Sequence, residues 1–575
     1  AVGNGKCSPD PAQQLCGRGK SGKAVGDDKG EICFGRRKQS EYSCKAVITV
    51  VRDEDIAKII AERPELKSLV FQRGFLITNC QFDINTLAFC SDWKLYTMGA
   101  FAVWLHPNTD FYTFQTDSTV YFLIGHAYNP ITKAYRETEI LREFASAWSR
   151  SREATDKYLN GLTGIFLVGW VSGDELYFQP DATAMRTAYW GIVKDKLYIS
   201  SHCHLVSFLD TITRDPYVDR LIGYKYYKFF GAGLPGDLSP FLELKRVQCN
   251  FEYHYSAGKM SFVRIFPGAR LHTGSYGETI DEIGTILAGN MELIQQKWGT
   301  KAALSLTGGR DSTTALAAAY KQFQSLQTFS YISCQGEKPD ADAADAISKQ
   351  LGISHQTYLI QLSQAEEDAC EAFSQIIEYN MGCIGKLKEK EIRKRVFFFY
   401  HPCFDVEIKS WVDEIGRARP YKRYRMKKFP HRVKPRYLTT MYKVFVANRA
   451  LACQTNKCFK NYLDTYYQNG VFEKIPWVDL IYWEYSWPAS EALHLICEHM
   501  LVFDVTIPFN NRLMLEKMLA IPLEKRIVDS IQIDVIEKLC PAINNTGIQV
   551  KDFGWTGKRE MAERIYWEIS HRLPY

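Results

Sequence analysis

Short runs of mostly apolar, β-type residues, separated by turn residues, fill the chain from residue 46 to about residue 266. The runs at 46–51, 119–124 and 196–200 are rich in β-branched and aromatic side chains and are too short for helices. One stretch, 137–149, instead has apolar residues at helical spacing. The pattern predicts a largely antiparallel α+β layered sandwich over residues 45–266.

From residue 277 the pattern changes to strands and helices in alternation. A long helical segment at 277–296 leads into a short apolar strand. After it we expect helices at 312–323, 341–351 and 363–381, strands at 327–334 and 356–360, and mostly helices at 437–540. Strands separated by helices form parallel, doubly wound sheets, whose ligands bind at the carboxyl ends of the strands. Residues 267–575 are therefore predicted to be an α/β doubly wound domain with a helical C-terminal part.

The first strand of this alternation runs into a double-glycine turn. Residues 304–316 read Leu-Ser-Leu-Thr-Gly-Gly-Arg-Asp-Ser-Thr-Thr-Ala-Leu. Because Gly308 and Gly309 have no side chains, the backbone amides of the turn can approach a phosphate closely. The N–H groups at the start of the next helix, near Ser312, supply further donors and a positive dipole end. The turn is therefore a predicted phosphate-binding site.

Polar side chains around the turn extend this prediction. Thr307, Ser312 and Thr313 offer hydroxyl groups, and Asp311 has a carboxylate where a phosphate-bound Mg²⁺ would lie. The Walker pattern, which needs Gly-x4-Gly-Lys-Ser/Thr, is absent. The segment instead resembles the Ser-Gly-Gly-x-Asp-Ser pyrophosphate loop of ATP pyrophosphatases, with Thr307 in place of the first serine. The alternative is a glycine-rich turn that binds no ligand.

Composition and charge add few constraints. The 575 residues are 46% hydrophobic and 24% charged, which is ordinary for a soluble globular protein of two to four domains. A net charge of +6 is small for this length and does not imply a nucleic-acid partner. No apolar run approaches the roughly 18 residues of a membrane span, and no apolar signal segment is visible. We expect a cytoplasmic protein that does not bind membranes.

Residues 1–44 form a polar tail that is rich in Gly, Lys, Ser and Asp. Such a composition cannot bury enough apolar surface to fold alone. Disulfides, or docking onto the body or onto a neighbouring subunit in a homo-oligomer or larger assembly, would order it, and the sequence does not choose between them. Four of the 16 cysteines lie in this tail, namely Cys7, Cys16, Cys33 and Cys44. The other twelve occur singly in apolar contexts and are expected to be buried free thiols.

The order of the two halves, a β-rich domain followed by a pyrophosphate-loop domain, resembles the asparagine synthetase family, which includes β-lactam synthetases and lasso-peptide cyclases. The likeness extends over roughly residues 90–545. In the first half, 120–129, 164–170 and 176–182 are similar to stretches of the family's glutaminase-like sandwich. That glutaminase uses an N-terminal cysteine whose own amino group is the base. Because this chain has Ala1 there, the resemblance implies a degenerate domain that makes no ammonia.

In the second half, the resemblance implies an ATP site made of the glycine turn and the next strand, 329–332. The residues implied are Leu306, Thr307, Gly308, Gly309, Asp311, Ser312, Ser330 and Ile332. The family's Gly-x-Gly-x-Asp-Glu-Leu-Phe-Gly-Gly motif resembles 410–418, although its glycines are missing here. Asp413 would then face Asp311 across the pyrophosphate and share Mg²⁺ with it. The alternative is an ordinary acidic pair on a solvated helix.

The resemblance also points to catalytic groups. The family has an acid or a tyrosine where this chain has Ser410, which leaves Glu407 and Glu414 as candidates for the general base. Lys525 and Arg526 lie where the family has a lysine that stabilises the developing oxyanion and pyrophosphate. The alternative for this pair is a helix C-terminus whose dipole favours cations.

A basic stretch follows the second acidic motif. Ten of the twenty residues from 417 to 436 are Lys or Arg and none is acidic, with Tyr421, Tyr424 and Phe429 among them. Such a mixture suits single-stranded nucleic acid, an acidic peptide or a phosphorylated partner. The alternative is a solvated loop that only attracts charged ligands.

These observations predict an ATP-dependent, AMP-forming carbon–nitrogen ligase without glutaminase activity. It would activate a small-molecule or peptide carboxylate as an acyl-adenylate, and a substrate amine would then form an amide or lactam. Two alternatives stay open. One is a catalytically impaired structural or assembly protein whose tail docks a partner, and the other is an adenylating RNA-modification enzyme.

Overall fold

The computed structural model describes residues 51–87, 89–224, 227, 233–271, 274–383, 387–442, 448–548 and 557–573. The polar tail with its four cysteines, and the strand expected at 46–51 except its last residue, lie outside these ranges. Residues from Ile48 to Tyr575 form one structural unit, which contains both predicted halves.

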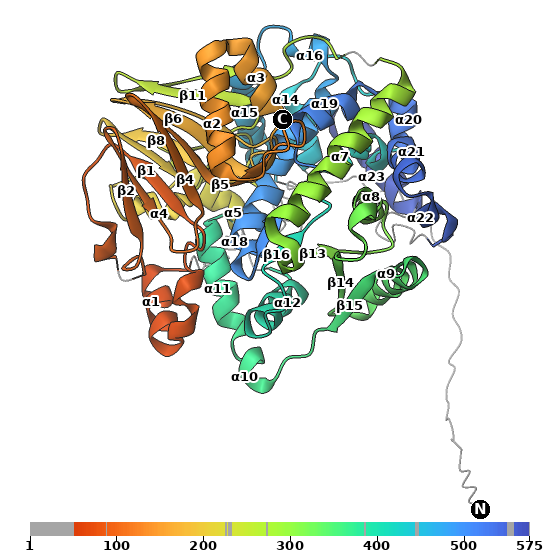
Figure 1. Cartoon of the computed structure of the whole chain (residues 1–575). Helices are drawn as coiled ribbons and strands as arrows, with labels where there is room; N and C mark the ends of the chain where they lie inside the picture. Colours follow the sequence, from red (N-terminus) through yellow and green to blue (C-terminus); the bar gives the residue numbers. More distant parts are fainter. Residues whose placement is uncertain are drawn as a thin grey trace, which may run out of the picture. The chain divides into compact units, whose positions relative to one another are not determined.

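Two six-stranded antiparallel sheets make up the first half (Figure 1). One has the strand order β10-β8-β9-β1-β3-β2, with β1 Phe75–Thr78, β2 Lys94–Met98, β3 Phe101–Leu105, β8 Tyr189–Val193, β9 Lys196–Ser200 and β10 Lys245–Arg246. The other has the order β12-β11-β7-β6-β5-β4, with β4 Phe111–Thr116, β5 Thr119–Tyr128, β6 Thr163–Ser172, β7 Glu175–Pro180, β11 Phe251–Ser256 and β12 Lys259–Arg264. The predicted antiparallel α+β sandwich is confirmed.

The second sheet is covered on both faces, which explains why its central strands are almost wholly buried. Successive side chains of a strand point to opposite faces. Leu123 of β5 and Val168 of β6 therefore pack against helices α2, Glu137–Arg150, and α3, Arg152–Asn160. Phe122 and its neighbours on the other face join the main core. The helix predicted at 137–149 is α2.

Among the described residues of this half, the other helices are short. They are α1 Asp53–Glu62, η1 Pro64–Leu69, η2 Ile84–Thr86, α4 Cys203–Ser207 and α5 Pro216–Ile222.

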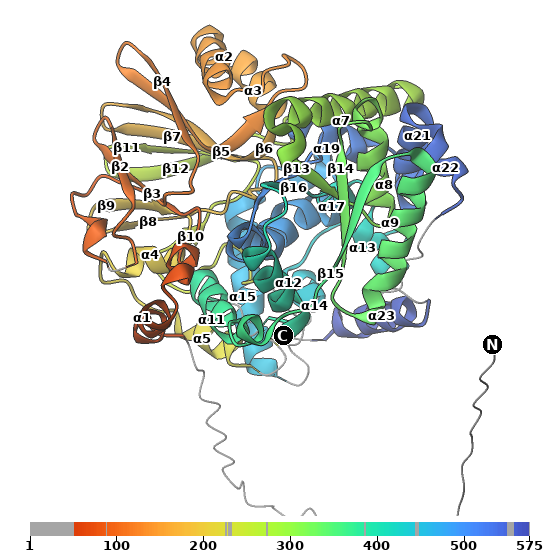
Figure 2. The ribbon, with the colours of Figure 1, turned by 60° about the horizontal axis from the view of Figure 1, so that its bottom comes forward.

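A five-stranded parallel sheet forms the centre of the second half (Figure 2). Its order is β15-β14-β13-β16-β17, with β13 Ala302–Ser305, β14 Gln327–Ile332, β15 Ser354–Leu359, β16 Val406–Ile408 and β17 Asp504–Thr506. The chain builds outward from β13 through β14 to β15 and then crosses to β16 on the other side of β13. Ligands of such sheets bind at this switch point, outside the carboxyl ends of the two strands. The predicted doubly wound parallel sheet is confirmed.

Helices cover both faces of the parallel sheet. Leu304 packs with Ala315 of α8 in the main core, whereas Ala303 faces a separate aromatic cluster that contains Phe398 of α12. The elements of this region are α7 Tyr276–Trp298, η3 Gly299–Lys301, α8 Arg310–Ala318, η4 Tyr320–Gln322, η5 Gln335–Glu337, α9 Lys338–Leu351, α10 Gln364–Glu367, α11 Cys370–Met381 and α12 Glu389–Tyr400. Two predicted helices differ, since 312–323 ends early in a 3₁₀ turn and 363–381 is divided into α10 and α11.

The C-terminal part is helical, as predicted. It contains η6 Asp413–Ile415, α13 Arg419–Arg423, α14 Pro435–Tyr442, α15 Arg449–Tyr466, α16 Val471–Lys474, α17 Trp477–Ile481, η7 Tyr482–Glu491, α18 Ala492–Cys497, η8 His499–Leu501, α19 Arg512–Ala520, α20 Leu523–Ile527, α21 Ser530–Leu539, α22 Pro541–Asn545 and α23 Gly557–Ser570. The element η7 is a π-helix of 10 residues that contains Pro488. In the described part of the chain, no helix is long and apolar enough to cross a membrane.

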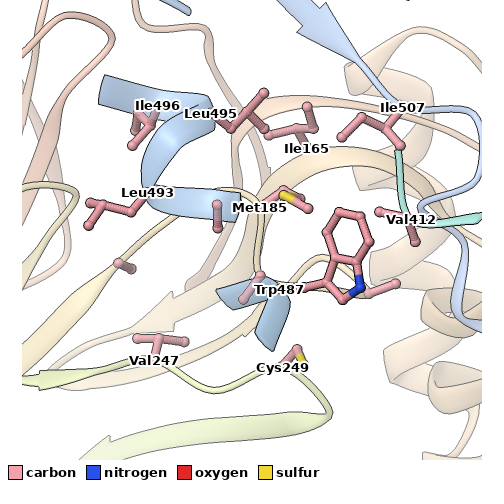
Figure 3. Packing of buried hydrophobic residues seen from close by; sticks show 14 of the residues in the cluster. Ile165, Met185, Val247, Cys249, Val412, Trp487, Leu493, Leu495, Ile496 and Ile507 are labelled. Atoms are coloured by element: carbon pink, nitrogen blue, oxygen red, sulfur yellow. The ribbon is translucent and has the colours of Figure 1, made fainter. Parts of the chain in front are cut away.

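The two halves share one hydrophobic core. Figure 3 shows Ile165 and Met185 of the first half in the same cluster as Trp487 of the second. Polar contacts hold the halves together at the segment after β17, where Asn510 Nδ2 donates to the Gly164 carbonyl at 2.7 Å. Asn510 also donates to Asp181 of the first half at 2.8 Å.

The twelve cysteines in the described ranges are free thiols. Burial in the core was expected for all of them, but Cys334 and Cys403 are exposed. The expectation of free thiols is confirmed for the described cysteines, and that of general burial is wrong.

Candidate functional site

The predicted pyrophosphate loop lies at the switch point, between the end of β13 and the start of α8. Gly309 is the N-cap of α8, so the first N–H groups of the helix point out of its end. Gly309 N donates to Thr307 Oγ1 at 3.1 Å, and the Ser312 hydroxyl donates to the Thr307 carbonyl at 3.0 Å. A side chain at residue 309 would come within 3.0 Å of Thr307 Oγ1. The loop hydroxyls and the Thr307 and Gly309 amides therefore shape the turn, which leaves the first N–H groups of α8 as the anion donors.

The strand next to the loop holds its first residue in place. The Leu306 amide donates to the Phe329 carbonyl at 2.9 Å, and the buried Ser330 hydroxyl donates to the Leu306 carbonyl at 2.7 Å. Ile332, at the end of β14, is half-buried. The residues expected around ATP thus lie on two adjoining segments, although the Ser330 hydroxyl already has a partner in the protein.

The second acidic motif comes next to the loop, in the turn that follows β16. Asp413 is fully buried, and burial together with the Asp311 carboxylate holds the pKa of Asp413 well above its usual range. Gln532 Nε2 donates to Asp413 Oδ1 at 2.8 Å, while Asp413 Oδ2 is buried without a hydrogen-bond partner. Val412 has a φ of 80°, a strained conformation for a β-branched residue, directly before this aspartate. The family resemblance predicted that Asp311 and Asp413 lie together, and in the structure they do.

Glu414 belongs to the same cluster. Its Oε2 atom is buried without a hydrogen-bond partner. Burial, and then the Asp311 carboxylate, raise the pKa of Glu414 to about 7. A carboxyl group that titrates near neutral pH is suited to take a proton during catalysis. Of the two candidates for the general base, Glu407 is instead bound by the Lys409 ammonium at 2.9 Å.

Two arginine side chains adjoin the acidic pair, and Lys422 lies beside them, paired with Asp529. Arg417 forms an ion pair with Asp311, and its Nε donates to Asp529 at 2.8 Å. Arg310, in the first turn of α8, has its Nε buried without a hydrogen-bond partner. Sequence reasoning assigned Arg417 to the basic stretch and missed Arg310 and Asp529. The only indication in the sequence that Arg417 belongs to the site was its position four residues after Asp413.

The structure places Lys525 and Arg526 away from this cluster. Arg526 is buried and donates twice to Asp479, at 3.1 and 2.8 Å. Lys525 is exposed, and its ammonium lies 4.9 Å from the centre of the Tyr276 ring. Both residues occupy the last turn of α20, which agrees with the alternative of cations at a helix C-terminus. Arg526 is thus committed to a buried ion pair, and the geometry gives no support for either residue as the oxyanion-stabilising group.

The basic stretch also differs from the expectation. Its aromatic residues Tyr421, Tyr424 and Phe429 are buried, and Phe429 packs edge-on against Trp567 of α23 at 5.3 Å. Buried rings cannot stack on the bases of a nucleic acid. Lys422, Arg423 and Arg425 are paired within the protein. The exposed cations are Arg425, Lys427, Lys428, Arg432 and Lys434. What the stretch offers a partner is therefore charge without exposed aromatic rings.

A magnesium ion fits the acidic pair only together with a nucleotide. Among the described residues, no three His, Cys, Asp or Glu side chains form a group that could hold a metal ion. Mg²⁺ commonly uses one or two protein carboxylates, with substrate phosphates and water as its other ligands. The buried, unpartnered Oδ2 of Asp413 is an acceptor suited to such an ion.

The raised pKa of Glu414 predicts how stability depends on pH. Its pKa in the folded state, about 7, is above the ordinary value of 4.5, so the folded state binds the proton more tightly. Stability should therefore fall as pH rises from about 4.5 to 7, by on the order of 2–3 kcal/mol. Glu414→Gln should flatten this part of the profile, as measured by urea unfolding at several pH values. Glu62→Gln, at an exposed glutamate of α1, should leave the profile unchanged, and equal profiles for wild type and Glu414→Gln would contradict the assignment.

Comparison with known proteins gives a family match for one part of the chain. Residues 301–398 match the family model described as queuosine biosynthesis protein QueC. The matched segment contains β13, the glycine turn and the sheet as far as β15. It covers less than half of the 575 residues, so it shows a similarity of this segment only. No curated protein matches the chain.

Three solved structures are similar in part. A glutamine phosphoribosylpyrophosphate amidotransferase from B. subtilis, complexed with ADP and GMP, is 12% identical over 54% of this chain and 67% of its own, with a TM-score of 0.21. A structure of the allosteric regulatory enzyme of purine biosynthesis is 11% identical over 52% and 65%, with a TM-score of 0.22. A glutamine-dependent NAD⁺ synthetase from Acinetobacter baumannii, in complex with ADP, is 12% identical over 34% and 42%, with a TM-score of 0.17.

For the last two of these structures, the chain spans less than two thirds of their length. At these TM-scores the superpositions carry no argument about mechanism. None of the three is an asparagine synthetase, so the resemblance to that family stays a prediction.

Proposed function

We propose that this chain is an ATP-dependent carbon–nitrogen ligase that activates a carboxylate as an acyl-adenylate and releases AMP and pyrophosphate. The observation that carries the proposal is the meeting of Asp311, in the first turn of α8, and Asp413, in η6, at the switch point of the parallel sheet. The QueC match over 301–398, which includes the glycine turn, supports an ATP-using synthetase. ATP and Mg²⁺ are the substrate and cofactor of this proposal.

In the proposed reaction, a substrate carboxylate oxygen attacks the α-phosphorus of ATP, and the bond from that phosphorus to the pyrophosphate oxygen breaks. The amides at the start of α8 bind the pyrophosphate, and Arg310 and Arg417 neutralise its charge. Mg²⁺ held by Asp311 and Asp413 would add to this neutralisation. A substrate amine then attacks the acyl carbon, AMP leaves, and Glu414 takes the proton of the amine.

One observation favours the alternative of a catalytically impaired assembly protein. The guanidinium of Arg417 pairs with Asp311, a proposed metal ligand. In the ligase, this arginine would have to exchange Asp311 for the incoming phosphate. The RNA-modification alternative loses the support of the aromatic residues in the basic stretch, because these are buried. An acidic or phosphorylated partner at the exposed cations of this stretch, and assembly through the tail, remain proposals.

The nucleotide products distinguish these functions without knowledge of the substrate. The protein is incubated with ATP, Mg²⁺ and a metabolite extract of its source, and the nucleotides are separated. We expect AMP and pyrophosphate, because no lysine in the loop is placed to hold a transferring γ-phosphoryl group. ADP and phosphate as the only products would contradict adenylation, and the absence of any turnover with any extract fraction would favour the assembly protein.

A further inference from the structure

A cavity of about 330 Å³ lies beside the acidic cluster, between α13, α14 and the π-helix η7. Aromatic and aliphatic side chains make up most of its wall. These are Tyr424, Leu438, Met441, Tyr442, Val478, Ile481, Tyr482 and Tyr485. Small-molecule sites are typically concave, mostly apolar and roughly 300–1,000 Å³ in volume, with a few polar groups that fix orientation. The cavity has the size and composition of a site for one small molecule.

The cavity adjoins the proposed catalytic groups. Its wall includes Arg419, which begins α13 two residues after Arg417. Arg419 also lies close enough to Glu414 to lower the pKa of that carboxyl group. Tyr482 of η7 also lines the cavity and lies near both Glu414 and Arg419, since burial and then the Glu414 carboxylate raise the pKa of its phenol while Arg419 lowers it. A ligand in the cavity would therefore lie close to the acidic cluster.

One face of the π-helix η7 and of the end of α17 supplies much of the wall. The lining residues of this region are Ile481, Tyr482, Tyr485, Ser486, Ala489, Ser490 and Glu491, so they recur about every four residues, which places them on one face of the helix. Pro488 lacks an N–H group and so prevents regular α-helical bonding here. π-helical turns are frequent at functional sites.

The cavity lining contains few charged side chains, and these include both cations and an anion. Arg419, Arg423 and Glu491 line the cavity, while the other side chains are apolar, phenolic or small. The Tyr442 hydroxyl donates to the Gly233 carbonyl at 2.7 Å, which fixes its ring in the wall. Tyrosine rings pack well on other flat rings. A ligand with a flat apolar ring and one carboxylate would suit this lining, because the ring could pack on the tyrosines and the carboxylate could lie near Arg419.

We propose that this cavity binds a small carboxylic acid with an aromatic body, and that this is the acid activated at the neighbouring ATP site. The second clause rests on the proposed function, whereas binding of the acid does not. The volume allows one ring or two fused rings and is too small for a folded peptide segment. The aromatic body would lie against Tyr482 and Tyr485, with its carboxylate directed toward Arg419.

Direct binding tests the cavity without ATP. Indole-3-propionate and 3-phenylpropionate are compared with propionate by calorimetry on the full chain. Burial of a ring should make at least one aromatic acid bind about tenfold or more tighter than propionate. If neither aromatic acid binds better than propionate, the inference is wrong, whatever the protein does with ATP.

A variant that fills the cavity locates the binding. Ser486 lines the cavity on η7, and Ser486→Trp should weaken binding of the aromatic acid at least about tenfold by occupying its space. Ser146→Trp, at an exposed serine of α2, is the matched control and should bind the acid as wild type does. Thermal unfolding checks that both variants are folded. Equal affinity of a folded Ser486→Trp and wild type would place the acid elsewhere and overturn the inference.

Exchange of labelled pyrophosphate into ATP separates this inference from the proposed function. Exchange that depends on the aromatic acid and is lost in Ser486→Trp is the expected result. Binding of the acid without any exchange would refute activation at this site while confirming the cavity as a binding site. Exchange with propionate that equals exchange with both aromatic acids would support the ligase and overturn the substrate class.

Discussion

Replacing either Asp311 or Asp413 by asparagine is expected to lower the rate of AMP and pyrophosphate formation by about 10²–10³-fold. Each substitution removes one of the two carboxylates that meet beside the glycine turn. Without both charges, Mg²⁺ cannot bridge the phosphates, and negative charge on the departing pyrophosphate is left uncompensated. The rate is measured as acid-dependent pyrophosphate exchange, at saturating ATP.

The effect should be catalytic and should not result from unfolding. Burial and Asp311 make ionisation of Asp413 unfavourable in the free protein, so Asp413→Asn is expected to unfold no more easily than wild type at neutral pH. Asp342→Asn, at an exposed aspartate of α9 in the same domain, is the matched control and should keep full activity. Wild-type rates in both Asp311→Asn and Asp413→Asn would remove the pair from the chemistry.

Local sequence patterns were sufficient to predict the fold. β5 and β6 are apolar along almost their whole length because one face of these strands packs on α2 and α3 and the other on the main core. The alternating strands and helices after residue 300 predicted a parallel sheet because a short connection cannot join parallel strands. Helix ends were less well predicted. The divided helix at 363–381 illustrates this, since Ser363 and Glu366 form a capping box for α10 and a new helix begins at Cys370.

The site was predictable only where its residues form a continuous motif. The loop at 306–312 and the Asp413–Glu414 pair each lie within a few residues of one another, and the structure brings them together. The buried partner of Arg526 could not be predicted, because Asp479 is 47 residues away in the chain. Arg417 was read as surface charge because Asp311 and Asp529 are more than 100 residues distant. A sequence shows which residues are charged, but not which charges neutralise one another.

Arg526→Ala is expected to lower the free energy of unfolding by about 3–5 kcal/mol, because it leaves the Asp479 carboxylate buried without its partner. Lys525→Ala, the adjacent control, removes an exposed ammonium over one ring and should change stability by less than about 1 kcal/mol. Urea unfolding followed by tryptophan fluorescence measures both. If the two substitutions have equal effects, the buried ion pair does not stabilise the fold.

Replacing both members of the Arg526–Asp479 ion pair tests whether Arg526 has any role in catalysis. The double variant Arg526→Met with Asp479→Leu replaces both charges by apolar side chains of similar size, so it should recover most of the stability lost in Arg526→Ala. Because neither residue contacts Asp311 or Asp413 in the described part of the chain, the double variant should also keep its pyrophosphate exchange within a few-fold of wild type. A folded double variant without exchange would instead return Arg526 to the catalytic residues. It would also mean that α20 moves toward the glycine turn when substrates bind.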